Sequence, residues 1–251
     1  MSGQCSEGSA EPATASPFGT ALCLPLRDLT VSIIVPALDE AGQIGAVLDS
    51  LAANEVVVVD GGSRDGTADL ARAHPSLPRV LHAGGGRAAQ CNAGATAATG
   101  DVLLFLHADS RLPPGATAAI RRACAEAALV GGNFALRFDG GDRFARGLGG
   151  LYALQRRFGF YYGDSSVWCR RSAFEALGGF RPLPVMDDYD FVRRLERLGP
   201  TTCLPGPATT SDRRWRAIGV GRTLTAWLVI RWLFVAGVSP QRLARLYGVV
   251  R

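Results

Sequence analysis

Two acidic residues in this sequence are placed to bind a charged ligand. Asp60 and Asp109 each follow a run of apolar residues, and His107 stands two positions before Asp109. Such runs are typical of strands buried on both faces of a parallel sheet. Ligands of open α/β sheets bind at the carboxyl ends of these strands, where an Asp oxygen suits a hard divalent cation that carries phosphates. Asp109 has a second interpretation, as the cap of a helix that starts near Pro113.

The first half of the chain alternates between strands and helices that would position these acids. Apolar and β-branched runs predict strands at 31–36, 55–60, 79–82 and 102–106, and apolar residues at helical spacing predict helices at 44–51, 68–73 and 87–99. The alternation predicts right-handed βαβ units and a parallel sheet with polar loops along one edge. Asp60 and Asp109 therefore converge on one cleft.

The second half is less regular, and its clearest feature is a helix that opens with acids. Patterns predict strands at 129–138 and 165–169, and helices at 143–158, 172–177 and from 186 onward. The last of these helices has Asp187, Asp188 and Asp190 in its first turn. The helix dipole favours negative charge there and accounts for at least one of them.

Composition limits the class of protein. A chain of 251 residues with 47% hydrophobic and 20% charged residues is globular, with room for one large α/β domain or two small ones. Its net charge is +5, and its basic residues are all Arg, scattered without the basic stripe that would indicate nucleic acid. This balance suits a phosphorylated substrate or an anionic membrane surface. Six Cys without a CxxC pair argue against a zinc site or a disulfide framework, and three His exclude a His-rich metal centre.

The two ends of the chain differ from the middle. Residues 1–28 are rich in small and polar residues and lack the pattern of a signal peptide, which predicts a disordered tail on a cytoplasmic protein. Residues 29–210 form the expected globular domain. Residues 211–251 form a helical extension whose apolar stretch, interrupted by Arg231, is too short to span a membrane securely. Trp227 and Trp232 suit a peripheral helix at the inner face of the membrane, and the alternatives are packing on the domain or a dimer contact.

Four motifs stand in a fixed order along the chain: VSIIVPALDE at 31–40, VVDGGSRDGT at 58–67, His107-Ala108-Asp109, and Asp187-Asp188. They resemble the motifs of the inverting family 2 glycosyltransferases: an opening strand with a closing Asp-Glu, VDDGSxDGT, a metal-binding DxD, and an acid pair with the catalytic base. The resemblance covers 31 to about 215. It implies the GT-A (Rossmann-like) fold, an α/β fold with a mixed, mainly parallel sheet flanked by helices. The segments GGSRDGT, LHADSRLPP and GVSPQRLARLY are similar to a bacterial subgroup associated with radical-SAM or selenium-related genes.

The resemblance implies metal-dependent transfer of a sugar from a UDP- or GDP-sugar to an acceptor, with inversion at the anomeric carbon. Asp109, with His107, would bind Mn²⁺ or Mg²⁺ at the diphosphate. Asp188 would be the general base, with Asp187 as the alternative. His107 stands where the family has an Asp, so the metal site loses a charge. The acceptor is unknown. One option is a polyprenyl phosphate bound by the C-terminal aromatic helix. The oligomeric state is also open.

By the same resemblance, residues of the first loops and of the 87–99 helix would line the nucleotide-sugar pocket: Pro36, Ala37, Glu40, Asp60, Arg64, Arg87 and Asn92. Asp60 would bind the nucleobase, its alternative being a turn residue before two Gly. The alternative for Asn92 is ordinary helix polarity in solvent. Asp164, Arg214 and Trp215 would contact the acceptor or the diphosphate, and Trp215 is equally suited to a core.

Two other functions compete with sugar transfer. A glycosyltransferase-like module that binds a nucleotide or a partner without turnover is compatible with His107 in the metal motif. A sugar-phosphate nucleotidyltransferase also uses an α/β nucleotide-binding sheet, but residues 37–44 lack the Gly-rich loop with a basic residue that this class needs. Ser211 replaces the Gln of the QxxRW element of processive family members, which disfavours polymer synthesis.

Overall fold

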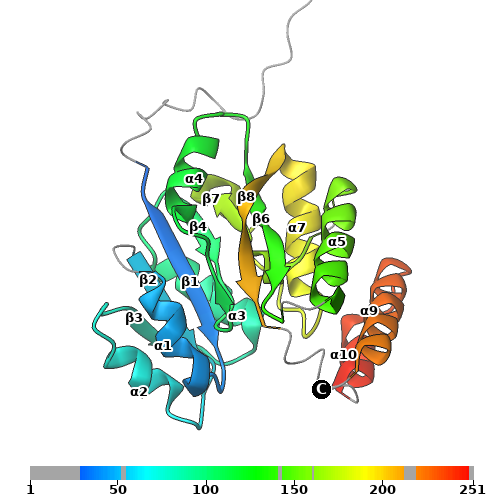
Figure 1. Ribbon diagram of the computed structural model, residues 1–251, viewed down its shortest axis with the longest axis horizontal. Coiled ribbons are helices and arrows are strands. Elements are labelled where there is room, and N and C mark those ends of the chain that lie inside the picture. Colours follow the sequence, from blue (N-terminus) through cyan, green and yellow to red (C-terminus); the bar gives the residue numbers. More distant parts are fainter. Residues whose placement is uncertain (1–28, 52–54, 141–142, 160, 212–218, 249–251) are drawn as a thin grey trace, which may run out of the picture.

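The computed structural model describes residues 29–51, 55–140, 143–159, 161–211 and 219–248. These residues form an eight-stranded mixed sheet in the order β3-β2-β1-β4-β7-β6-β8-β5, and helices flank it (Figure 1). The tail expected to be disordered, residues 1–28, lies outside the described residues. The fold confirms the prediction of a mixed α/β sheet flanked by helices.

The parallel part of the sheet comes from the first half of the chain. Its elements are β1 (Val31–Ala37), α1 (Ala41–Asp49), β2 (Glu55–Asp60), α2 (Thr67–Arg72), β3 (Arg79–His82), α3 (Arg87–Ala97) and β4 (Val102–Phe105). β1 pairs in parallel with β2 on one side and with β4 on the other, and Ala37 lies beside Asp60. The loops after β1, β2 and β4 therefore lie along one edge of the sheet, as the sequence predicts.

The second half of the chain makes the sheet mixed. Its elements are β5 (Ser110–Arg111), α4 (Ala116–Ala123), β6 (Gly131–Phe138), α5 (Arg143–Arg157), the 3-10 turn η1 (Gly163–Ser165), β7 (Trp168–Arg170), α6 (Arg171–Ala176), α7 (Asp187–Leu198) and β8 (Thr201–Thr210). β7 runs antiparallel to β4 and β6, and β6 runs parallel to β8. A Cβ at Gly132 would collide with the carbonyl of Thr202, so glycine permits the close approach of β6 and β8.

The sequence pattern does not predict β8, and it places β7 too early. β8 contains Pro205 and Pro207, which normally interrupt strands. The chain accommodates them through a shift of register against β6 between Phe134 and Leu136. The strand expected at 165–169 begins only at Trp168, because η1 takes up the preceding residues.

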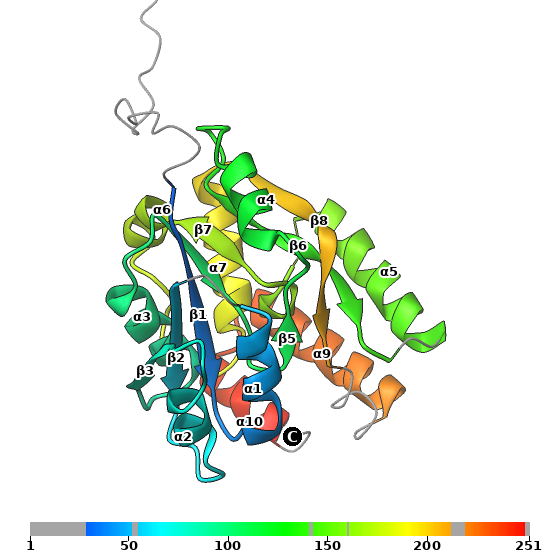
Figure 2. The ribbon, with the colours of Figure 1, turned by 60° about the vertical axis from the view of Figure 1, so that its left-hand side comes forward.

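Helices cover both faces of the sheet (Figure 2). Two apolar clusters hold them there. On one face, Ile33 and Val35 pack with residues of α1 and α4 such as Ile44 and Ile120, all fully buried. On the other face, Ile34 packs with residues of α3, α6 and α7. Alternate side chains of β1 thus enter opposite clusters, and burial of both faces fixes the register of the strands that carry the polar loops.

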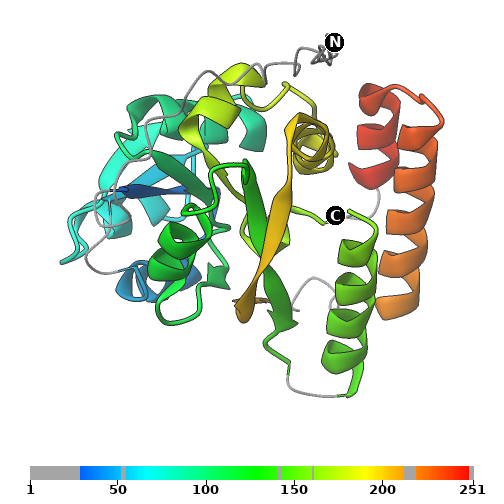
Figure 3. The ribbon, with the colours of Figure 1, turned by 90° about the horizontal axis from the view of Figure 1, so that it is seen from above.

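The C-terminal extension is a helical hairpin of α9 (Val220–Val235) and α10 (Pro240–Gly248), beside α5 (Figure 3). The rings of Trp227 and Tyr162 lie 4.4 Å apart, and those of Phe234 and Tyr189 lie 5.9 Å apart. Trp232 instead remains 66% exposed. One side of α9 therefore packs on the domain, and another side faces solvent. Among the described helices, none has the length and apolar character needed to cross a membrane.

Candidate active site

The loops after β1 and β2 brace each other and form one rim of the cleft. The Asp39 N–H donates to the Ser63 hydroxyl at 2.9 Å, and the Arg64 N–H donates to the Asp39 carboxylate at 2.9 Å. Asp65 accepts hydrogen bonds from the backbone of Ala41 and Thr67 at 2.9 and 3.0 Å. The first two motifs of the sequence are therefore one structural unit. The Arg64 side chain is exposed, and the bracing roles of Asp39 and Asp65 are not predicted by the sequence analysis.

Asp60 ends β2 at this rim, with its side chain 7% exposed. Its carboxylate accepts hydrogen bonds from the N–H groups of Gly62 and Ser63 at 3.0 and 3.2 Å, and His82 Nδ1 lies 3.5 Å away. Burial raises the pKa of Asp60, but these hydrogen bonds together lower it by more, so the pKa falls below its ordinary value. Asp60 is thus an anionic acceptor that shapes its own turn, and its contact with a nucleobase stays a prediction.

Two polar residues of α3 are engaged inside the protein. The Gln90 amide donates to the carbonyls of Ala37 and Val59 at 2.8 and 2.9 Å, which joins α3 to β1 and β2. The Asn92 amide donates to the Phe180 carbonyl at 2.8 Å and accepts from the Phe180 N–H at 2.9 Å. The expectation that Asn92 faces the nucleotide is corrected here, because both ends of its amide hold the loop before α7.

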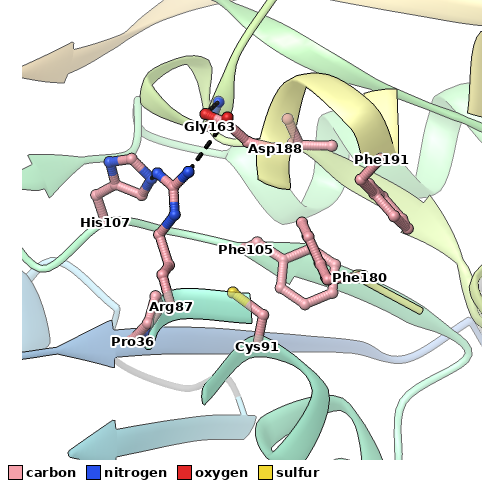
Figure 4. A pocket seen from close by; sticks show the side chains of 10 residues that line it. Pro36, Arg87, Cys91, Phe105, His107, Gly163, Phe180, Asp188 and Phe191 are labelled. Atoms are coloured by element: carbon pink, nitrogen blue, oxygen red, sulfur yellow. Dashed lines mark hydrogen bonds and ion pairs between the residues drawn. The ribbon is translucent and has the colours of Figure 1, made fainter. Parts of the chain in front are cut away.

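Arg87, the first residue of α3, is the centre of the cleft (Figure 4). Its Nε and Nη2 donate to the two oxygens of Asp187 at 3.0 and 2.5 Å, and Nη2 also lies 3.2 Å from Asp188 Oδ1. Its Nη1 lies 3.2 Å from His107 Nε2. The Arg87 side chain is 35% exposed, whereas that of Asp187 is 6% exposed. One guanidinium therefore joins the third and fourth motifs of the sequence.

The two acids of α7 have different surroundings. Both oxygens of Asp187 bind the fork of Arg87. Asp188 is 14% exposed and lines the cavity, and its Oδ2 accepts the Gly163 N–H at 2.9 Å. Burial raises the pKa of Asp188, while Arg87 and the backbone of Gly163 lower it by more in total. Asp188 is consequently ionised at neutral pH and is the better placed of the two to meet a ligand.

His107 connects Arg87 to a further acid. A guanidinium has only donors, so His107 Nε2 accepts from Arg87, and the proton of the neutral ring sits on Nδ1. Nδ1 lies 3.4 Å from Asp164 Oδ1 in η1. Burial raises the pKa of Asp164, as do the nearby charges of Asp188 and Asp109, although His107 opposes them. The loop after β4, η1 and the first turn of α7 thus bring Asp109, Asp164 and Asp188 near one another.

Asp109 is half-buried and does not cap the next helix, since α4 begins after Gly115 without a side-chain cap. The chemistry of Asp109, Asp164 and His107, two carboxylates and an imidazole, fits a hard divalent cation that shares its coordination with phosphate oxygens. Among the described residues, no three His, Cys, Asp or Glu side chains are gathered in a ready-made metal site. His107 Nε2 is engaged by Arg87, so any cation here would depend on the ligand for part of its coordination.

The cavity between these groups is small. Its volume is about 10 Å³, which is room for about one water molecule. Its lining is Pro36, Arg87, Cys91, Phe105, His107, Gly163, Val167, Phe180, Asp188 and Phe191. Burial raises the pKa of Cys91 to about 12, so the thiol stays protonated and is no nucleophile. A Cβ at Gly163 would lie 2.6 Å from His107 Nε2 and 3.1 Å from Asp188 Oδ2. This role of Gly163 is missed by the sequence analysis, although its position before Asp164 is a signal.

Three of the remaining predicted residues lie in or near the loop after β1, and two lie outside the described residues. Pro36 lines the cavity, Ala37 is buried beside Asp60, and the Glu40 N–H donates to the Thr67 hydroxyl at 2.9 Å. Arg214 and Trp215 lie outside the described residues, so their predicted contacts with acceptor or diphosphate stay predictions.

Motif order, fold and cleft together define a class of protein. Residues 32–179 match glycosyl transferase family 2. This is more than half of the chain, which belongs to that family and is a glycosyltransferase. The PGL/p-HBAD biosynthesis glycosyltransferases of Mycobacterium bovis (strain BCG / Pasteur 1173P2) and Mycobacterium tuberculosis (strain ATCC 25177 / H37Ra) are 33% identical to it over 176 residues. The alignment covers 64% of this chain and 67% of each relative.

Solved structures of low identity share the fold. The S. aureus TarS 1-349 complex with UDP-GlcNAc aligns with a TM-score of 0.61 at 17% identity, over 74% of this chain and 59% of TarS 1-349. Mannosyltransferase PcManGT from Pyrobaculum calidifontis, in complex with GDP-Man and Mn²⁺, aligns with a TM-score of 0.60 at 21% identity, over 88% and 70% of the two chains. Glucosyl-3-phosphoglycerate synthase from Mycobacterium tuberculosis, with Mn²⁺, UDP and phosphoglyceric acid, gives 0.55 at 22% identity, over 82% and 79%. At these identities the likeness establishes the fold.

Proposed function

We propose that this glycosyltransferase transfers a sugar from a UDP- or GDP-sugar to an acceptor hydroxyl, with inversion at the anomeric carbon. One observation carries the proposal: Asp188 lines the same cavity as His107, whose motif ends in Asp109. In this proposal one carboxylate would serve the acceptor, and the other would serve the diphosphate and its cation. The structural neighbours with UDP-GlcNAc and GDP-Man support a nucleotide-sugar donor.

The proposed donor site follows the rim formed by the first two motifs. Asp60, an anionic acceptor at the end of β2, would accept the ring N–H of a uracil or guanine base. Pro36, Ala37 and Glu40 would line the pocket, and Arg64 would reach it from the exposed loop. Both bases carry a ring N–H, so Asp60 is compatible with UDP and GDP alike.

In the proposed reaction, Asp188 accepts the proton of the acceptor hydroxyl while the acceptor oxygen attacks the anomeric carbon from the face opposite the diphosphate. The bond from the anomeric carbon to the diphosphate breaks, and a nucleoside diphosphate leaves with the electron pair. A single displacement of this kind inverts the anomeric centre. General-base catalysis by a placed carboxylate contributes about 10²–10⁴-fold in rate.

A divalent cation, Mn²⁺ or Mg²⁺, is part of the proposal, and its supports are the Mn²⁺ complexes of neighbours and the charge of the site. Asp187 and Asp188 pair with Arg87, and Asp164 lies near the charges of Asp188 and Asp109. A diphosphate adds further negative charge, which a cation held by Asp109 and the phosphates would offset. His107 and Asp164 are the nearest additional ligands.

The proposal is tested with a panel of UDP- and GDP-sugars, with Mn²⁺ or with a chelator, by measuring release of nucleoside diphosphate. Turnover that falls at least about 10²-fold in Asp188→Asn supports the assignment. Tight nucleotide binding without turnover, unchanged in this variant, would favour the binding module without catalysis. That alternative has support in the small cavity and in the engagement of His107 by Arg87. The bacterial subgroup associated with radical-SAM or selenium-related genes stays a prediction.

We also propose that the C-terminal hairpin places the enzyme at an anionic membrane surface. Residues 213–251 contain eight Arg and no Asp or Glu. The solvent side of α9 exposes Leu228, Val229 and Trp232 by 43, 47 and 66%. Cationic and apolar side chains together suit the interface of a bilayer with anionic lipids. Such a location would give access to a lipid-linked acceptor.

Sedimentation with vesicles separates this location from the alternatives. Binding to vesicles of phosphatidylcholine with phosphatidylglycerol, lost in Trp232→Ser, supports it. Leu77→Ser is the matched control, because Leu77 is 80% exposed in the connection between α2 and β3. Absence of binding, or equal loss in both variants, would refute it, and a dimer that Trp232→Ser dissociates would identify the face as a contact between two copies.

A further inference from the structure

We propose that Arg87 takes two positions in the reaction: the one seen here, on Asp187 and Asp188, and a second one on the diphosphate of the donor. Donor binding would thereby uncover the base before the acceptor reacts. This inference rests on the proposed function and adds a positioning role that links the donor half of the site to the base.

The observed position of Arg87 blocks three groups at once. Its fork covers both oxygens of Asp187, its Nη2 reaches Asp188 Oδ1 at 3.2 Å, and its Nη1 holds the lone pair of His107 Nε2 at 3.2 Å. In Figure 4 its guanidinium lies between His107 and Asp188. The base and the imidazole of the metal motif are therefore both engaged by one side chain.

A diphosphate that enters the cavity beside His107 and Asp188 has to displace a side chain that lines it. About 10 Å³ accommodates about one water molecule, and a diphosphate is several times larger. Phe105 and Phe191, which line the same cavity, are 4% and 0% exposed in the core. Arg87 is 35% exposed, is unbranched, and follows Gly85 and Gly86, whose φ angles are 94° and 88°. Arg87 is thus the lining side chain that can move without disturbing the core.

The chemistry of a guanidinium permits the exchange. Arg binds carboxylates and phosphates with the same two-pronged geometry, so Arg87 keeps a matching partner when a phosphate replaces Asp187. After the exchange, Asp188 keeps the N–H donors of Gly163 and Tyr189, at 2.9 and 2.8 Å, which hold its orientation. Its Oδ1 loses Arg87, and the acceptor hydroxyl can take that place. The Nε2 of His107 becomes free in the same movement.

Competition between Asp187 and the diphosphate gives a measurable signature. Binding of UDP and GDP is measured by calorimetry on the full chain, with a chelator and with Mn²⁺. Arg87→Ala is expected to weaken binding by at least about tenfold, the effect of one charge-assisted hydrogen bond. Asp187→Asn is expected to tighten binding by about tenfold, because it releases Arg87 to the phosphates. Transfer activity should nevertheless fall in both variants.

Asp164→Asn is the matched control for charge, since it removes a neighbouring carboxylate that has no hydrogen bond to Arg87. With the chelator present, so that no cation is bound, the logarithm of the dissociation constant should change by less than half as much as it does in Asp187→Asn. Arg181→Ala is the control for loss of an ion pair, because Arg181 pairs with Asp190 on the surface of α7. It should leave nucleotide binding unchanged. Thermal melts identify any variant that fails to fold.

Arg87→Lys provides a second variant if Asp187→Asn is unfolded. It keeps a cation for the diphosphate but loses the two-pronged contact with Asp187 and with a phosphate alike, so it should bind the nucleotide more tightly than Arg87→Ala does. Equal tightening by Asp187→Asn and Asp164→Asn, or weaker binding in Asp187→Asn than in the wild type, would overturn the inference and leave the proposed function intact. If Asp187→Asn is unfolded, binding in Arg87→Lys that is no tighter than in Arg87→Ala would overturn it. If the wild-type protein neither binds a nucleotide nor turns over any sugar nucleotide, the inference and the proposed function are both overturned.

Discussion

Gly163→Ala is the change whose effect follows most directly from the geometry of the site. The new Cβ would lie 2.6 Å from His107 Nε2 and 3.1 Å from Asp188 Oδ2, inside a cavity of about 10 Å³. Neither neighbour can yield easily, since His107 contacts Arg87 and Asp164, and Asp188 accepts the Gly163 N–H at 2.9 Å. Overpacking of this kind costs about 1–3 kcal/mol of stability.

The effect on activity should exceed the effect on stability. A methyl group at this position displaces the base and the imidazole together, and misplacement of a reacting group by about 1 Å costs on the order of 10²-fold in rate. The assay combines urea unfolding with initial rates of nucleoside diphosphate release. Gly150→Ala is the matched control, because Gly150 lies in the middle of α5 with no atom within 4 Å of a new Cβ.

The control should gain about 0.5–1 kcal/mol of stability, since Ala is the better helix former, and should keep full activity. A Gly163→Ala variant with wild-type stability and activity within about twofold of wild type, far from the 10²-fold loss, would refute the arrangement of His107, Gly163 and Asp188 described here.

Three further predictions concern the rim, the metal and the C-terminal hairpin. Asp60→Asn should raise the KM for the donor by about tenfold with little change in kcat, as expected for loss of one charged hydrogen bond. Because the pKa of Asp60 in the folded protein is below its ordinary value of 3.8, the stability from its ionised form is present above that value and is lost as pH falls through the folded-state pKa. Asp60→Asn should therefore melt below the wild type at pH 7, and the difference should shrink in acid. A chelator should abolish turnover and Mn²⁺ should restore it; turnover that persists after dialysis against the chelator would remove the metal from the mechanism. Trp227→Ala should lose about 2 kcal/mol in urea unfolding because its half-buried ring packs on Tyr162, whereas Trp232→Ala, at an exposed ring, should stay within about 0.5 kcal/mol.

The sequence predicts the parallel half of the fold well, for a physical reason. β1, β2 and β4 are buried on both faces, so their apolar runs are continuous, and each is followed by a Gly or polar loop. That the loops carrying Asp60 and Asp109 lie along one edge of the sheet follows from those strands alone. The sequence pattern does not predict β8, because Pro205 and Pro207 normally interrupt a strand. A shift of register against β6 accommodates them, and that shift depends on tertiary structure.

The site is predicted in part. The types of residue and their order indicate the four motifs. The loop after β4 carries Asp109, and the first turn of α7 carries Asp188. The partners of each side chain are not encoded locally. The hydrogen bonds between Arg87 and Asp187 join residues that are 100 positions apart in the sequence. Asn92 looks like a pocket residue in the sequence, but the carbonyl and N–H of Phe180, which come to it only in the folded chain, take both ends of its amide.

The central claim is that Asp188 drives a single displacement at the anomeric carbon of a nucleotide sugar. The most direct test is the anomeric configuration of the sugar released from the active nucleotide sugar in the presence of Mn²⁺, followed by proton NMR before the anomers equilibrate. Water serves as the acceptor, so the natural acceptor need not be known. We predict that the released sugar has the anomeric configuration opposite to that of the donor, and that Asp188→Asn releases none above background. A sugar with the configuration of the donor would contradict the mechanism.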